Sequence, residues 1–363
     1  MHAGAFMQLK KITKKIRCAI SMQVGILFVI LCLLVILSTG MGYIHIPFYD
    51  AARIIMAEIT GQFDLIQDMD PVFKVVVMDV RLPRILTAAL VGAGLAASGV
   101  VFQGILLNPL ADPYTLGVSA GAAFGASLAL LFNLSVFGVF SIPVFAFAGA
   151  LCTLGAVIYL SFGSRPATSS LSSNNLILSG IIVTAILSAG ISFLKYVADE
   201  EVSVIIFWLM GSFTSKTWPE VMLVFSVVCS GFLVFVFFSR DLNLMSLGNR
   251  TASSLGVSTG FITLILLVSA SIVAAICVSV SGIIGFVGLL VPHMMRALTG
   301  PDNRKLLPVS LFAGAILLLC ADTITRALLP DEMPIGVLTA LIGGPFFCYI
   351  FRKRQVSGGR VQQ

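Results

Sequence analysis

Apolar residues gather in long runs along almost the whole chain, and short polar stretches separate these runs. A helix that crosses about 30 Å of hydrocarbon needs about 20 such residues. Barrel strands would instead alternate apolar and polar residues over about 10 positions. The pattern therefore predicts an all-α, polytopic membrane protein with about ten transmembrane helices. The predicted spans are residues 19–42, 85–107, 114–132, 136–160, 175–197, 219–238, 259–279, 283–298, 306–325 and 335–351.

Two other stretches do not fit a simple span. Residues 43–80 form an amphipathic stretch with the largest group of acidic residues in the chain. Residues 199–213 are apolar but too short to cross a bilayer, so they predict a re-entrant or interfacial helix.

Small residues crowd 92–99 (GAGLAASG) and 117–127 (GVSAGAAFGAS). Such runs predict close packing of helix backbones in lipid.

The composition also favours an integral membrane protein. Hydrophobic residues make up 58% of the 363 residues and charged residues 10%, whereas a soluble domain is about 45–50% apolar and about 25% charged. The mean hydropathy is +1.06. A soluble fold of this size could not bury so much apolar surface.

The basic residues indicate how the chain is oriented. The net charge is +6, and the lysines and arginines lie mainly at the ends of the predicted spans. Ten spans place both termini on one side, and that side carries most of the 22 basic residues. The positive-inside rule makes it the cytoplasmic side. We therefore expect a multi-pass protein of the inner (cytoplasmic) membrane, with cytoplasmic tails at 1–18 and 353–363 and no nucleic-acid partner.

The sequence carries no motif for catalysis. It contains no HExxH motif and no GxxxxGK[ST] phosphate-binding loop, and its three histidines support no Ser–His–Asp set. Acidic residues are almost missing from the spans, and Asp322, near the outer end of the ninth span, is the exception. We predict no catalytic residue, no metal site and no cofactor.

The scarcity of ionisable groups also bears on the energy source. Proton- or sodium-driven carriers usually need such groups at mid-membrane, and ion pores need a charged ring or a carbonyl filter. Neither feature is visible, which favours a helical pathway that takes its energy from a partner protein. Two alternatives from other classes stay open at this point: a self-sufficient secondary carrier or channel, and a membrane-bound enzyme.

Four motifs carry a resemblance to a known family. They are RLPR (81–84), NPLADP (108–113), GFVGLLVPH (285–293) and a late PIG followed by GGPFF (334–347). In this order and spacing, the chain resembles the FecCD-type permeases of bacterial ABC importers for iron–siderophores, haem and vitamin B12. The resemblance runs from about residue 20 to 352. It implies a type II ABC importer permease fold with ten spans, over residues 19–352.

The resemblance also implies partners and cargo. Such permeases form a homodimer, or pair with a related permease, around a pathway at the dimer axis. They work with two cytoplasmic ABC ATPase subunits and an extracytoplasmic substrate-binding protein, in contact with membrane lipid. We expect an iron–siderophore complex as cargo because that branch of the family is the most populous. Haem and cobalamin are the alternatives, and a secondary carrier is a distant one.

Three arginines at outer span ends match docking positions of the family. Arg81 and Arg84 begin the second span, and Arg326 ends the ninth. In the vitamin B12 permease the matching arginines meet glutamates of the binding protein, and guanidinium groups suit carboxylates. The resemblance implies that these three arginines face water and dock the binding protein. The residues alone would favour interfacial anchoring of the span ends.

The longest internal cytoplasmic loop, 239–258, matches the ATPase-coupling loop of the family. It is polar, punctuated by glycine and rich in helix-capping residue types. The resemblance implies two short helices that sit in a cleft on the ATPase. Asn249 stands where the family usually has glutamate. The implied coupling residues are Leu247, Gly248, Asn249, Arg250, Ala252, Leu255 and Gly256.

Residues 171–175 (LSSNN) precede the fifth span on the cytoplasmic side. They match the stretch that narrows the inner mouth of the pathway in the vitamin B12 permease, which implies a gate at Ser173 and Asn174. The residues alone predict an N-cap for the span, and both roles are compatible. Two isolated polar residues, Gln103 and His293, are expected to hydrogen-bond within the bundle.

Overall fold

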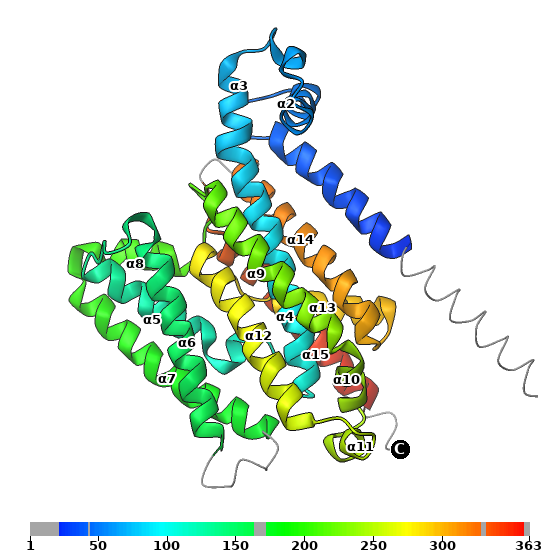
Figure 1. Ribbon diagram of the computed structural model, residues 1–363. Coiled ribbons are helices and arrows are strands. Elements are labelled where there is room, and N and C mark those ends of the chain that lie inside the picture. Colours follow the sequence, from blue (N-terminus) through cyan, green and yellow to red (C-terminus); the bar gives the residue numbers. More distant parts are fainter. Residues whose placement is uncertain (1–21, 43, 163–171, 328–331, 359–363) are drawn as a thin grey trace, which may run out of the picture.

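The computed structural model describes residues 22–42, 44–162, 172–327 and 332–358. The predicted N-terminal tail, 1–18, lies outside these residues. Every regular element within the described residues is helical, as the apolar runs predict. The helices form an elongated bundle with shorter elements at its two ends (Figure 1).

Each predicted span contains a helix. Within the described residues, seven helices are long and apolar enough to cross a membrane by themselves, and the shorter apolar ones are α5 and the first part of α15, Ile335–Tyr349. The all-α membrane fold is therefore confirmed. The helices are Met22–Gly40, α4 (Leu82–Ile105), α5 (Val118–Leu131), α6 (Ser141–Phe162), α7 (Ser173–Val197), α9 (Trp218–Phe237), α12 (Thr259–Ser281), α13 (Val287–Thr299), α14 (Asn303–Ala327) and α15 (Ile335–Gly358).

Most of these helices begin and end within five residues of the predicted bounds, and two of the differences are informative. The prediction placed one span over 283–298, but α13 starts only at Val287. Gly282 and Phe286 have φ angles of 72° and 68°, which interrupt the helix between α12 and α13. At the other extreme, α15 continues to Gly358, into the segment predicted to be a tail.

Helix α4 lies at the centre of the bundle and packs against α9, α12, α13 and α14. Small residues permit this close packing. A Cβ atom at Gly92 would overlap the backbone of Gly314 in α14, and one at Gly99 would overlap Gly288 in α13. The predicted close packing of 92–99 is thus confirmed, since van der Waals contact between backbones needs residues without bulk.

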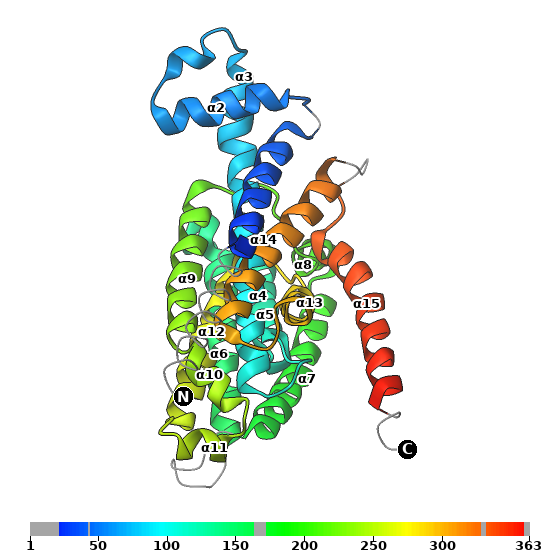
Figure 2. The same cartoon turned by 90° about the vertical axis from the view of Figure 1, so that its right-hand side faces the viewer.

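The amphipathic stretch 43–80 caps one end of the bundle, which we call the outer end after the predicted orientation (Figures 1 and 2). Its last element is a π-helix that runs directly into α4. The predicted short helix within 199–213 is also present, as α8. The elements on this side are α2 (Phe48–Thr60), η1 (Phe63–Ile66), α3 (Pro71–Val75), η2 (Val76–Arg81), η4 (Gly138–Phe140), η5 (Asp199–Glu201) and α8 (Val202–Leu209).

Two short helices lie at the opposite, inner end of the bundle (Figures 1 and 2). They are α10 (Ser239–Met245) and α11 (Asn249–Ser254). The resemblance implied two short helices within 239–258, and the structure has them.

The NPLADPY motif forms the turn between α4 and α5. Asp112 accepts hydrogen bonds from the backbone N–H groups of Tyr114 (3.1 Å) and Thr115 (2.9 Å), and so caps η3 (Pro113–Leu116). Burial raises the pKa of Asp112 to about 6, and the two hydrogen bonds oppose that shift. The Tyr114 hydroxyl donates to the carbonyl of Ile284 at 2.6 Å. The turn is therefore fastened to the interruption between α12 and α13.

Candidate transport sites

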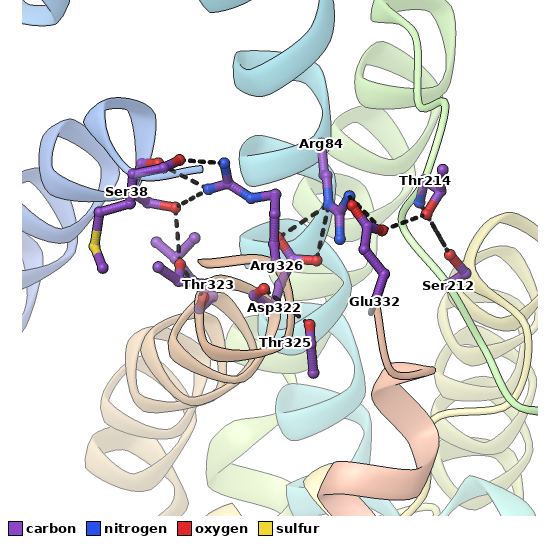
Figure 3. A network of polar contacts seen from close by, with 11 residues as sticks. Ser38, Arg84, Ser212, Thr214, Asp322, Thr323, Thr325, Arg326 and Glu332 are labelled. Carbon is purple, nitrogen blue, oxygen red and sulfur yellow. Dashed lines mark hydrogen bonds and ion pairs between the residues drawn. The ribbon is translucent and has the colours of Figure 1, made fainter. Parts of the chain in front are cut away.

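Three arginines lie near one another at the outer end of the bundle. Figure 3 shows two of them, Arg84 and Arg326. Arg81 and Arg84 are three residues apart and therefore share one face of the continuous η2–α4 helix. Arg326 lies in the last turn of α14, one turn after Asp322. Because α4 and α14 pack side by side, the four side chains come together. A π-helical turn such as η2 frequently occurs at a functional site.

Arg84 is buried between two carboxylates. Its Nε donates to Asp322 Oδ1 at 3.0 Å, and its Nη1 contacts the two oxygens of Glu332 at 3.0 and 3.1 Å. Arg84 is 8% exposed and Asp322 1%, whereas half of the Glu332 side chain is exposed. Thr214 donates to the same Glu332 carboxylate at 3.1 Å. The network thus joins α4, α14 and the segments before α9 and α15.

Arg81 and Arg326 bind the end of the first helix. Arg81 donates to the carbonyls of Thr39 (2.6 Å) and Ile44. Arg326 donates to the carbonyls of Met41 and Ser38, the latter at 2.7 Å. The last carbonyls of a helix lack donors within the helix and favour nearby cations. These two arginines therefore fasten the helix Met22–Gly40 to the bundle.

The expectation that all three arginines face water is not met. Arg81 is 5% exposed and Arg84 is 8% exposed. The Nη atoms of Arg326 donate hydrogen bonds to backbone carbonyls and to the Ser38 hydroxyl. The physical reason is that the carbonyls at the end of the first helix need hydrogen-bond donors and the buried Asp322 needs a cation. The sequence did indicate a cation beside Asp322, because an acid within an apolar span needs a partner of opposite charge. Glu332 was not predicted from the sequence as a partner of Arg84.

A cavity of about 190 Å³, lined by both polar and apolar side chains, adjoins the arginine cluster. Arg84, Asp322 and Glu332 line it, together with Ser212 and Thr214 from the segment between α8 and α9. Arg84 is thus a docking candidate that borders an open space.

The turns that follow α10 and α11 expose apolar side chains at the inner end. Leu247 and Leu255 are 63% and 59% exposed, whereas Ala252 is fully buried and holds α11 in place. Gly248 and Gly256 have φ angles of 101° and 88°, which glycine adopts without strain. The predicted coupling residues therefore lie on one small cap, with two leucines facing outward.

Asn243 ties this cap to the start of α14. Its Nδ2 donates to Asp302 Oδ1 at 2.7 Å, and its Oδ1 accepts from the backbone N–H of Asn303 at 2.8 Å. Leu242 of α10 contacts Gly104 near the end of α4. A displacement of the cap would therefore act directly on both helices that reach the arginine cluster.

The predicted gate residues lie at the first turn of α7. Ser173 donates to the carbonyl of Ile105 at 3.4 Å, which places this turn beside the inner end of α4. Asn174 is exposed. The structure brings the predicted gate to the inner end but leaves it separate from the arginine cluster.

The structure tests one expectation about a polar residue in a span. Gln103 donates to the carbonyl of Leu289 in α13 at 3.2 Å, so the predicted hydrogen bond to a neighbouring helix is confirmed. Among the described residues, no group of three or more His, Cys, Asp or Glu side chains could hold a metal ion.

Comparison with known proteins defines the family. The model of the FecCD transport family matches residues 30–353, which is most of the chain. The chain belongs to the FecCD transport family. It is an ABC importer permease, a transport subunit that is not itself an enzyme, and the resemblance seen in the four motifs is confirmed.

This FecCD permease resembles proteins named for different cargoes. It is 40% identical to the molybdate import system permease protein MolB of Haemophilus influenzae, over 92% of this chain and 97% of MolB. It is 36% identical to the Fe(3+)-citrate import system permease protein YfmE of Bacillus subtilis, over 95% and 98%. It is 42% identical to the cobalamin import system permease protein BtuC of Halobacterium salinarum, over 78% and 75%.

A solved structure matches the fold over nearly its full length. It shows an inward-facing conformation of a transporter described as metal-chelate type. The TM-score is 0.78 and the identity 35%, with 91% of this permease and 98% of that chain covered.

Proposed function

We propose that this permease moves an iron–siderophore complex inward across the cytoplasmic membrane, with both of its termini in the cytoplasm. The observation that supports this cargo best is the full-length similarity to a Fe(3+)-citrate permease and to a transporter of metal-chelate type. Haem and cobalamin remain the alternatives within the family, and the similarity to MolB adds molybdate. A permease fold by itself does not specify cargo.

The cargo is tested with the assembled importer in proteoliposomes. The assembly contains the permease, its ATPase and its binding protein, and the measurement compares ATP-driven uptake of a ferric siderophore, haemin, cobalamin and molybdate. We expect the ferric siderophore to accumulate fastest, and an excess of unlabelled ferric siderophore, but not of cobalamin, to inhibit this uptake. Accumulation of one of the other three cargoes without the siderophore would contradict the assignment.

We further propose that two copies pair around the pathway. Helix α15 diverges from the bundle toward the inner end (Figure 2), and its main contacts among the described elements are with α13 and α14. Its Leu341 and Ile342 are exposed, as are Ile181 and Ile186 on α7. A second copy would cover such faces.

Disulfide crosslinking of Asn174→Cys between two copies tests whether the gate lies at their axis, and no crosslink would count against it.

The ATPase docks, in this proposal, on the cap formed by α10 and α11. Two exposed leucines on a polar, water-facing end are the kind of apolar anchor that a partner cleft buries. The absence of a phosphate-binding loop in the sequence means that ATP hydrolysis belongs to the partner.

At the outer end, we propose that Arg84 receives a carboxylate of the binding protein. Its partner Glu332 is half exposed and borders the cavity beside the arginine cluster, so a carboxylate of the docking protein can take the place of Glu332. Arg81 and Arg326 have the different role of anchoring the first helix.

The proposal predicts different outcomes for these arginines. Arg84→Glu should lower the on-rate of the loaded binding protein by about tenfold at low salt, with a smaller effect at high salt, since salt screens such steering. Arg81→Glu and Arg326→Glu should reduce the yield of folded permease. Surface plasmon resonance at several ionic strengths measures the on-rates, with Arg53→Glu as the control at the same end. A parental on-rate for Arg84→Glu at low salt would reject the docking role.

A further inference from the structure

A large apolar groove separates the first helix from the rest of the bundle. Its volume is about 600 Å³. One wall is a helical stripe of Met22–Gly40 that includes Phe28, Cys32 and Val35. The opposite wall includes Leu82 and Leu86 of α4. We call this space the first-helix groove.

The first-helix groove lies between membrane-spanning helices and beneath the elements of the outer end. Both walls belong to helices long and apolar enough to span a membrane, and α2, the cap of the outer end, forms the roof through Ile55, Glu58 and Ile59. Trp218 also lines the groove, and its Nε1 donates to the carbonyl of Met78 at 3.1 Å. Tryptophan with its N–H satisfied and its ring on apolar surface is typical of the membrane–water interface.

The chemistry of the lining selects an apolar occupant. Apart from Glu58 at the roof, the lining is apolar, and Trp218 has already used its donor. A water molecule would find too few partners there, because buried water needs two to four polar contacts. An unfilled gap would remove van der Waals contacts from both walls. An acyl chain from the surrounding bilayer satisfies these conditions.

At the roof of the groove, Glu58 forms an ion pair with a neighbouring cation. Lys74 of α3 lies 3.3 Å from Glu58 of α2, and their side chains are 43% and 40% exposed. The Lys74 ammonium also sits 4.7 Å from the centre of the Phe63 ring. A zwitterionic head group complements this pair, with its phosphate beside Lys74 and its ammonium beside Glu58. A primary ammonium donates hydrogen bonds to a carboxylate.

We propose that the first-helix groove is a binding site for one phosphatidylethanolamine-type lipid. An acyl chain fills the groove between Met22–Gly40 and α4, and the zwitterionic head group inserts between Glu58 and Lys74. The lipid completes the packing of a helix whose polar fastening to the bundle is concentrated at its outer end, through Arg81 and Arg326.

The test is native mass spectrometry of the full-length permease from nanodiscs that contain equal parts of phosphatidylethanolamine, phosphatidylglycerol and phosphatidylcholine. We expect one retained phosphatidylethanolamine per chain. Cys32→Trp fills the groove and should lower this occupancy at least fivefold. Cys152→Trp is the matched control, since Cys152 is also an exposed, free cysteine on a membrane helix, outside the groove. Glu58→Gln should retain a lipid but lose the preference for the primary amine.

A second measurement does not depend on the folding of a variant. Phosphatidylethanolamine with a photoreactive diazirine in its acyl chain is added to the parental permease, and crosslinked peptides are mapped. We expect crosslinks to concentrate in 28–36 and 78–86. Equal lipid retention by Cys32→Trp and Cys152→Trp, a head-group composition equal to that of the nanodisc, or crosslinks spread evenly over the lipid-facing helices would each overturn the proposal.

Discussion

Replacing Leu255 by glutamate is expected to abolish copurification of the ATPase with the permease. Leu255 is an apolar side chain, 59% exposed, at the end of α11 on the inner cap. A carboxylate at the same place would be buried without a partner in the interface, and such burial costs several kcal/mol. Each 1.4 kcal/mol is a tenfold loss of affinity, so we expect a loss of at least a hundredfold. Leu247→Glu should have a similar effect.

The matched control is Val139→Glu. Val139 is also apolar and exposed, at 87%, but it belongs to η4 on the outer side. Pull-down of the tagged ATPase measures binding, and size-exclusion chromatography verifies that each permease variant is folded. Leu255 is a cleaner test than Gly256, whose φ of 88° would strain any other residue. ATPase binding by Leu255→Glu at the level of Val139→Glu would show that the ATPase docks elsewhere.

Removing the carboxylate of Asp322 is expected to destabilise the permease by about 3 kcal/mol or more, as for other broken buried ion pairs. Asp322→Ala leaves Arg84 with only the half-exposed Glu332, and it removes the nearest acid from Arg326. Denaturant unfolding in detergent, followed by tryptophan fluorescence, measures the free energy of unfolding.

Two further variants separate charge pairing from loss of packing. Glu332→Gln should cost less than about 1 kcal/mol, because an ion pair with a half-exposed partner is partly screened. The double variant Arg84→Met with Asp322→Leu should be more stable than Asp322→Ala, since no uncompensated charge remains at Arg84. Equal destabilisation by Asp322→Ala and Glu332→Gln would contradict this description of the cluster.

The spans were predictable because hydrocarbon imposes a simple requirement of length and apolarity on each helix. The start of α13 was not predictable from the sequence. The interruption before it depends on positive φ angles at Gly282 and Phe286, and one of these two residues is not glycine. The same apolar sequence is compatible with a helical and with an unwound backbone, so it does not show where the helix is interrupted. Tyr114 reaches this interruption from a distant turn, and such a contact has no signature along the chain.

The arginine cluster shows the limit for site residues. The position of Arg81, Arg84 and Arg326 at outer span ends was predictable from the apolar pattern. Their burial was not, because most of the acceptors of Arg81 and Arg326 are backbone carbonyls of residues 38–44. Carbonyl acceptors occur at every residue, so sequence does not reveal which ones a guanidinium group will satisfy.

The central claim is that this permease transports cargo only with energy supplied by a partner. Uptake of the ferric siderophore into proteoliposomes tests it, with purified permease alone or together with ATPase, binding protein and ATP. We predict no uptake by the permease alone under a proton or sodium gradient, and accumulation once all three additions are present. Uptake by the permease alone, driven by either gradient, would contradict the account.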